Sequence, residues 1–148
     1  MSTEVRISQN TAILLEHARG KGLSDEVILE AVRSGDTTSL DTVSEEHFTY
    51  EDFLSYAQEH NEPLEQAVRE GYRITFNTRN GLKIWLEKAF GLQSDRDFQV
   101  GEGVVSGLSL TAEQTRLLEQ RLAPNWVIAE SVNTAESHEL TLKLRALA

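Results

Sequence analysis

Histidine and carboxylate side chains are the residues of this chain best suited to chemistry, and they gather between positions 45 and 62. His47 and His60 stand there among several Asp and Glu residues, a mixture of ligands that suits zinc, manganese or iron. However, the two histidines do not have the four-residue helical spacing that directs two imidazoles at one ion. His17 and His138 lie outside this segment. We therefore expect no metal site and no cofactor, and we interpret the four histidines as surface or capping residues.

Sequence motifs of the common enzyme classes are missing. The chain has no G-x-x-x-x-G-K-[ST] phosphate loop, no H-E-x-x-H zinc helix and no G-x-S-x-G nucleophile elbow. The glycine-rich segment 101–107 has the wrong spacing for a dinucleotide fingerprint, and its glutamate would repel a pyrophosphate. The absence of cysteine excludes disulfides, thiolate metal sites and a cysteine nucleophile. Carboxylate pairs such as Glu45/Glu46 and Glu51/Asp52 fall at expected helix starts, where they stay solvated. These observations favour a non-catalytic protein over an enzyme.

The acidic residues are distributed unequally along the chain. No lysine or arginine occurs between Arg33 and Arg69, whereas nine acidic residues do. Residues 1–72 carry 15 acidic and 5 basic side chains, a net charge of −10, and residues 73–148 carry 9 of each, a net charge of zero. Such asymmetry in charge between two halves of a chain usually reflects the partners that the protein binds, rather than its fold. The field of the first half repels duplex DNA and anionic membranes, and it attracts a basic surface.

The charge distribution bears on the binding of duplex DNA and of single-stranded nucleic acid. Segment 22–26 leads into a short helix as in helix-turn-helix proteins, but Asp25, Glu26 and Glu30 stand where a recognition helix needs basic or amide side chains. We therefore expect no binding to duplex DNA. In the second half, basic and aromatic residues are interleaved, a pattern that also occurs in proteins that bind single-stranded nucleic acid. The residues of this pattern are Tyr72, Arg73, Phe76, Arg79, Lys83, Trp85 and Lys88.

The first half is predicted to be helical, with four successive segments that place apolar residues at helical spacing. We expect the second helix to be capped by Ser24 and to end at Gly35. We expect Thr49 to cap the third helix and Asn61 to cap the fourth. Gly71 should end the fourth helix, since a glycine readily adopts the left-handed conformation that follows a helix.

These helices resemble two copies of one unit. Residues 15–35 and 54–71 match when a gap is allowed, and both end in the pattern Ala-Val-Arg-x-Gly. A duplication would give two helix-turn-helix hairpins that stack over a shared apolar face, as in helical repeat proteins. The same pattern is also a favourable ending for any helix, so duplication and coincidence both stay open.

After Gly71 the hydrophobic pattern alternates between strand and helix periods. Thr78 or Asn80 should open one helix, and Thr111 with Gln114 should form a capping box at the start of another. The element order β-α-β-α-β-β predicts a small α+β layer with a sheet of about four strands. We expect the strands over 72–76, 98–110, 125–129 and 140–145, the second of them bent by its glycines.

The sequence therefore predicts an α+β protein in which an acidic all-helical region, 1–71, is followed by a small α+β domain, 72–148. No segment reaches the roughly 18 apolar residues of a membrane span, and no secretory signal is recognisable. We expect a cytoplasmic protein of bacterial size that does not enter a membrane. The main core is expected in the second half and should contain Ile74, Phe76, Trp85, Leu86, Leu117, Leu118, Trp126 and Ile128.

These features favour an interaction or regulatory protein whose acidic helical face binds a basic protein surface. A first alternative is a small enzyme or ligand-binding domain with a pocket between the two halves. A second alternative is single-stranded nucleic-acid binding by the second half. The identity of the partner and the oligomeric state do not follow from the sequence. The acidic face is predicted to consist of Glu45, Glu46, Glu51, Asp52, Glu59 and Glu62.

Overall fold

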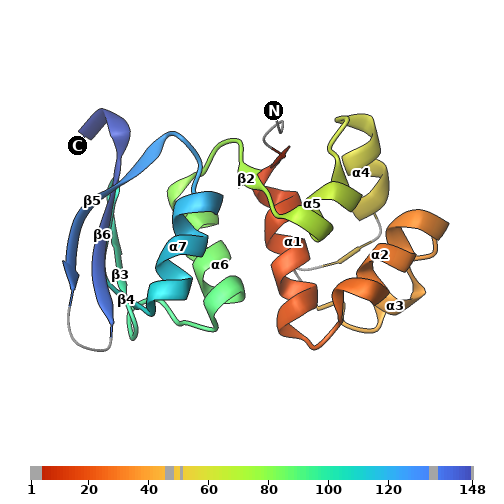
Figure 1. The fold of residues 1–148 in the computed structure, drawn as a ribbon, viewed down its shortest axis with the longest axis horizontal. Coiled ribbons are helices and arrows are strands. Elements are labelled where there is room, and N and C mark those ends of the chain that lie inside the picture. The colour runs from red at the N-terminus through yellow and green to blue at the C-terminus, as the bar shows by residue number, and fades with distance from the viewer. Residues whose placement is uncertain (1–4, 46–48, 51, 134–136, 148) are drawn as a thin grey trace.

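The computed structural model describes residues 5–45, 49–50, 52–133 and 137–147. Figure 1 shows the helices of the first half at one end, a four-stranded sheet at the other end, and two helices of the second half between them. The predicted α+β fold class is therefore confirmed, with helices first and a small antiparallel sheet after them.

The helix α1 (Gln9–Gly20) is the central element of the first half. Eight successive residues, 11–18, are buried because α1 is covered on more than one side, by α4 of its own half and by α6 of the second half. The helix α2 packs against α5. The pairs α1 with α4 and α2 with α5 are those that a duplication would relate. The further helices of this half are α2 (Asp25–Ser34), α3 (Thr38–Asp41), α4 (Phe53–Glu59) and α5 (Leu64–Glu70).

The predicted ends of α2 are confirmed. The Ser24 hydroxyl accepts a hydrogen bond from the backbone N–H of Val27 at 3.3 Å, which satisfies one of the unpaired donors at the helix start. Gly35 follows the helix with a φ of 76°, in the left-handed region.

Two predicted helix starts are wrong. Thr49 does not cap α4, because the next residue, Tyr50, is fully buried and its hydroxyl donates to the Leu14 carbonyl at 2.8 Å, which holds this segment against α1. Asn61 does not cap α5, because it adopts a φ of 54° and closes the turn that follows α4. The helix α5 starts instead after Pro63, which has no N–H to satisfy.

The segment after Gly71 does not join the main sheet. Its short strand β2 (Arg73–Ile74) pairs in parallel with β1 (Arg6–Ile7), so the N-terminal segment and the start of the second half lie side by side. Phe76 was predicted in the core and this prediction is wrong, since 59% of its surface is exposed. The chain turns outward there, and the following loop is held by hydrogen bonds from Asn77 to Gln9 and Asn125.

The main sheet is antiparallel, with the strand order β3-β4-β6-β5. The segment predicted as one bent strand forms the hairpin of β3 and β4, because Gly103 adopts a φ of 70° in the connecting turn. A Cβ at this position would also lie 2.3 Å from the Leu147 side chain. The predicted caps at Thr78 and Thr111 are confirmed, the latter as a capping box with Gln114. The elements of this half are α6 (Arg79–Phe90), β3 (Gln99–Gly101), β4 (Val104–Leu110), α7 (Ala112–Arg121), β5 (Trp126–Asn133), β6 (His138–Leu144) and a 3₁₀ turn (Arg145–Leu147).

The hydrophobic core is one cluster that extends through both halves, rather than being concentrated in the second half. Leu15 of α1 and Leu86 of α6 are both fully buried in it. Of the predicted core residues, Leu117 and Ile128 are half-buried. The predicted core residues that are buried are Ile74, Trp85, Leu86, Leu118 and Trp126.

Candidate functional site

The residues predicted for the acidic face differ in their surroundings. Glu46 and Glu51 lie outside the described residues. Asp52, which precedes α4, and Glu59, the last residue of α4, are both exposed to solvent. These two carboxylates can therefore meet a partner directly, whereas the other two described members of the set are engaged within the chain.

Glu45 holds the loop that follows α3 against α1. Its carboxylate forms an ion pair with Lys21 and accepts from His17 Nε2 at 3.1 Å. The hydrogen bond from Lys21 and that from His17 lower the pKa of Glu45 to about 2. Glu45 is thus ionised at neutral pH, but its charge is already compensated by groups of the first half.

Glu62 is bonded to the start of α1. Its carboxylate accepts from the backbone N–H of Ser8 at 3.1 Å and from the Thr11 hydroxyl at 3.0 Å. A carboxylate is favoured there because the first N–H groups of a helix are unpaired and carry partial positive charge. Glu62 therefore fixes the turn between α4 and α5 against α1, and it is half-buried.

A groove of about 480 Å³ between α2 and α3 carries exposed carboxylates that were not in the predicted set. Glu26 and Glu30 stand one helical turn apart on α2, and Asp36, in the connection between α2 and α3, lines the same groove. Val27, partly exposed, and Ala31 form the apolar part of the lining. The signal that could have found this site is the i, i+4 spacing of two glutamates on the face of α2 opposite its buried residues.

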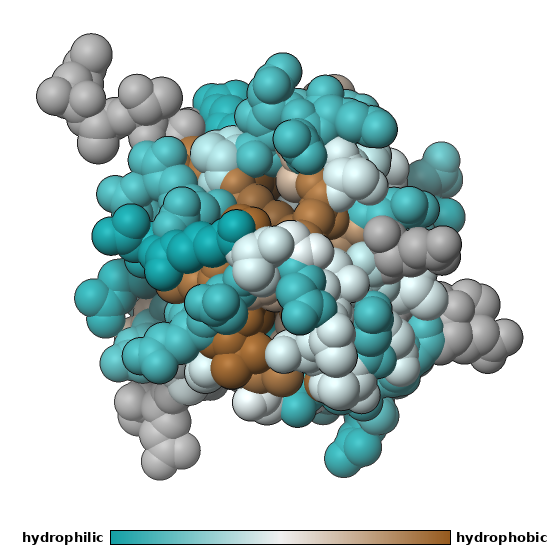
Figure 2. Space-filling view, turned by 90° about the vertical axis from the view of Figure 1, so that its right-hand side faces the viewer, coloured by the Kyte–Doolittle hydropathy of each residue, from teal (hydrophilic) through white to brown (hydrophobic). Residues whose placement is uncertain are grey.

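A second groove of about 350 Å³ runs between α2, α4 and α5. Its lining includes the apolar side chains Val32, Leu54 and Leu64, and Glu65 stands at its edge in an ion pair with Arg33 at 2.6 Å. Figure 2 views the molecule from the side of α2, α3 and α4, and it shows apolar side chains in a hollow that is surrounded by hydrophilic ones.

Several acidic side chains of the first half form ion pairs with other described residues. These pairs take their bases from the first half, where Arg19, Lys21 and Arg33 are engaged. These three bases compensate part of the acidic charge of the first half.

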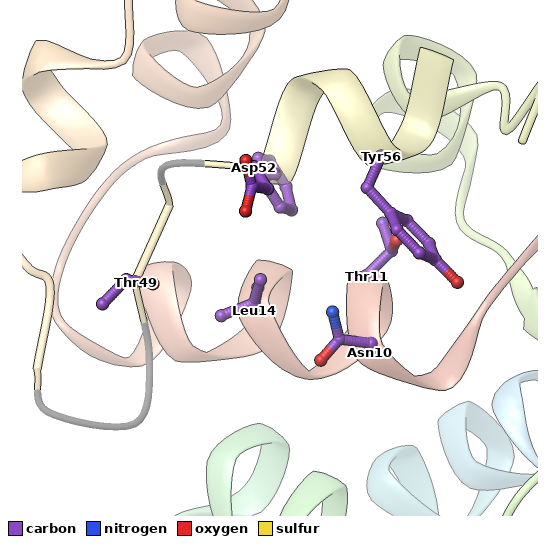
Figure 3. A pocket seen from close by; sticks show the side chains of 7 residues that line it. Asn10, Thr11, Leu14, Thr49, Asp52 and Tyr56 are labelled. Carbon is purple, nitrogen blue, oxygen red and sulfur yellow. The ribbon is translucent and has the colours of Figure 1, made fainter. Parts of the chain in front are cut away.

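A polar pocket of about 290 Å³ lies between α1 and α4. Figure 3 shows Asn10 and Thr11 on α1 opposite Asp52, which precedes α4, and Tyr56 on α4. The Thr11 hydroxyl already donates to Glu62. The pocket lies within the first half, whereas the ligand-binding alternative predicts one between the halves.

A chain of hydrogen bonds runs from the exposed residue Glu45 to the buried side chains of His17 and Tyr50, an order that resembles a catalytic relay. His17 Nδ1 and the Leu14 carbonyl oxygen each lie 2.8 Å from the Tyr50 hydroxyl oxygen. Burial raises the pKa of Tyr50 well above its usual value, so this hydroxyl stays protonated. Because Tyr50 is 0% and His17 only 1% exposed, neither can reach a substrate, and the arrangement holds the loop on α1.

The interpretation of His17 as a surface or capping residue is wrong. Its position three residues after Leu14, on the apolar face of α1, is the signal for burial.

The junction of the two halves is filled by a buried polar network. The Tyr72 hydroxyl donates to the Glu16 carboxylate at 2.6 Å and accepts from Trp85 Nε1 at 2.9 Å. Arg19 pairs with the same carboxylate at 3.0 Å, and the Arg121 guanidinium lies 4.7 Å from the centre of the Tyr72 ring. These contacts give no support to a pocket at this junction.

The described residues contain neither a candidate metal site nor a membrane-spanning helix. Within the described parts of the chain, no group of three or more metal-binding side chains is placed to hold an ion; His60 stacks on Tyr56 at 4.0 Å, and His47 lies outside those parts. Over the same ranges, no helix is both long and apolar enough to cross a bilayer. Comparisons with protein-family models, curated protein sequences and solved structures give no significant match to this chain.

Proposed function

We propose that this protein is a non-catalytic interaction or regulatory protein whose acidic helical half binds a basic surface of another protein. The observation that carries the proposal is the set of exposed carboxylates in the first half, together with the hollow lined by apolar side chains on the side of α2, α3 and α4 (Figure 2). Glu26, Glu30 and Asp36 line the groove between α2 and α3, and Asp52 and Glu59 are exposed at the start and the end of α4.

This surface fits the two chemical parts of a lysine or arginine side chain. The aliphatic stem can pack on Val27 and Ala31, and the charged head can reach the carboxylates that border the same groove. Because the acidic charge is concentrated in one half, its field also orients an approaching basic partner and raises the association rate. Such steering weakens when salt screens the charges.

The other functional alternatives receive less support. For single-stranded nucleic acid, base stacking needs exposed aromatic rings, but Tyr72 and Trp85 are buried and only Phe76 of the three is exposed. For duplex DNA, the net charge of −10 opposes contact with the phosphates. The lack of cysteine is compatible with a reducing compartment, and we propose that the protein acts in the cytoplasm.

The proposal is tested by affinity capture from cell lysate with a charge variant and a matched control. The variant Glu26→Gln/Glu30→Gln/Glu59→Gln removes three exposed carboxylates of the first half. The control Glu102→Gln/Glu130→Gln/Glu139→Gln removes three exposed carboxylates of the second half, so the change in net charge is the same. We expect the variant, but not the control, to lose basic partners at low salt, and wild type to lose them at high salt. Equal partner profiles for all three proteins would reject the proposal.

A further inference from the structure

A separate pocket of about 320 Å³ lies in the second half, and two arginine residues line it. Arg73 comes from β2, and Arg145 begins the 3₁₀ turn after β6. The pocket is completed by the end of α7 and the start of β5, which lie with these segments along the upper edge of Figure 1. Its volume is near the lower end of the range for small-molecule sites, about 300–1,000 Å³.

Both guanidinium groups are oriented by the same short turn, 122–124, between α7 and β5. Arg73 Nη1 donates to the Leu122 carbonyl and Arg145 Nε donates to the Pro124 carbonyl, each at 2.7 Å. Bonds of this length are typical of a charged donor. A guanidinium that is already held in place loses less side-chain freedom when a ligand binds, so less binding energy is spent on ordering it.

The two guanidinium groups are suited to bind an oxyanion. A guanidinium presents several N–H donors in one plane, which matches two oxygens of a carboxylate or phosphate. Arg145 uses Nε for its bond to the turn, so its two terminal nitrogens are the donors that it can offer to a ligand. Glu119 also lines the pocket, and its negative charge disfavours a ligand with several anionic groups.

The remaining lining is apolar and defines the other part of the ligand. Leu122 is buried, while Val127 and Ile128 are half-buried, so the two β5 side chains present apolar surface that a ligand can cover. We propose that this pocket binds a small organic anion, in which an apolar body contacts Val127 and Ile128 and a single carboxylate or phosphate group contacts Arg73 and Arg145. This site is independent of the acidic surface of the first half.

The proposal is tested by NMR titration of the ¹⁵N-labelled full chain, at constant ionic strength, with 2-naphthoate, 2-naphthyl phosphate and inorganic phosphate as probes. The two naphthyl probes distinguish the anionic group, and inorganic phosphate tests the need for an apolar body. We expect saturating amide shifts for residues around 122–128 and 145 with one or both naphthyl probes, and binding at least roughly tenfold weaker for inorganic phosphate.

Three variants identify the groups that bind. Arg145→Gln should weaken binding by roughly tenfold, the usual loss for one charge-assisted contact, whereas the control Arg116→Gln changes an exposed arginine of α7 outside the pocket and should have no effect. Val127→Glu, which places a carboxylate at the apolar wall, should abolish binding without removing either arginine. Any one of three outcomes would overturn the proposal. These are a titration that does not saturate at about 10 mM probe, amide shifts that cluster elsewhere in the protein, and equal affinity of wild type and Arg145→Gln for the probe.

Discussion

The Tyr72 hydroxyl donates a 2.6 Å hydrogen bond to the Glu16 carboxylate, and through this bond the start of the second half is joined to the central helix of the first. The same hydroxyl oxygen accepts from Trp85 Nε1 of α6, so one phenol connects three elements. Burial, and then the charge of Glu16, raises the pKa of Tyr72, so the phenol stays protonated and remains a donor. A carboxylate with so little exposure is stable here because Arg19 also pairs with it.

The Tyr72→Phe variant should lower the free energy of unfolding by about 1–3 kcal/mol, the usual cost of leaving a buried polar group without its partner. It removes the donor to Glu16 and the acceptor for the Trp85 indole N–H at once. The free energy of unfolding is measured by urea unfolding for this variant and for Tyr56→Phe. The latter changes a half-exposed tyrosine on α4. Equal stability of the two variants would show that the network contributes little to joining the halves.

A second prediction concerns the contribution of His17 to stability as a function of pH. Burial lowers the pKa of His17 below 6.5, and the hydrogen bond that His17 donates to Glu45 opposes this only in part. The unfolded chain, with the ordinary pKa, therefore takes up a proton before the folded protein does. The contribution of His17 to stability is full above about pH 6.5 and is lost as the pH falls through this value towards the lower folded pKa.

The His17→Gln variant should accordingly lose less stability than wild type between about pH 7.5 and 5.5, measured by urea unfolding at both values. Glu45, with a pKa of about 2, keeps its charge over this interval, so its own contribution is lost only at lower pH. His138→Gln is the control, because it removes a histidine at the far strand β6. An unchanged pH slope in His17→Gln would contradict the assignment to this imidazole.

A third prediction compares two aromatic residues that the sequence assigned to the same core. Trp85 is 1% exposed, and its ring contacts that of Phe90 in an edge arrangement with the ring centroids 5.4 Å apart. Trp85→Ala should therefore lower the free energy of unfolding by about 3–5 kcal/mol. Phe76 is 59% exposed, and Phe76→Ala should change stability by no more than about 0.5 kcal/mol. Thermal unfolding of both variants is the measurement. A large loss for Phe76→Ala would show that this ring packs against the protein in solution.

Local signals in the sequence predicted the regular elements well. The hydroxyl residues Ser24, Thr78 and Thr111 act as helix caps because their side chains can accept from a backbone N–H two or three residues later. The α+β class followed from the change of hydrophobic period after Gly71. These features depend on residues close in sequence, which is why they could be predicted.

The surroundings of the acidic residues could not be predicted in the same way, because they depend on contacts between distant segments. Glu62 is bonded to Ser8 and Thr11, more than fifty residues away, and nothing near Glu62 in the sequence indicates this. Phe76 alternates correctly with Ile74 for a strand, but the partner strand at Arg6–Ile7 is too short to continue the pairing. The acidic charge was visible in the sequence, whereas its division between internal and exposed carboxylates was not.

A fourth prediction concerns Gly81, in the first turn of α6, which is in contact with the side chain of Gln9 from α1. A glycine inside a helix normally costs about 1 kcal/mol relative to alanine, so Gly81→Ala would ordinarily stabilise the protein. Here an added Cβ would lie 1.8 Å from Gln9 Nε2, and the amide would have to move. That amide accepts from Asn77 Nδ2 and from the Thr78 N–H, both at 2.9 Å, so its displacement breaks the bonds that fix the loop before α6.

We therefore expect Gly81→Ala to destabilise the protein by about 1–2 kcal/mol, since the lost hydrogen bonds exceed the gain in helix propensity. In a Gln9→Ala background the obstacle is absent, and Gly81→Ala should be neutral or stabilising there. A double-mutant cycle measured by urea unfolding gives the coupling directly, with an expected value above about 1 kcal/mol. Additive effects of the two substitutions would show that Gln9 does not occupy the space above Gly81, and that α1 does not pack closely on the start of α6.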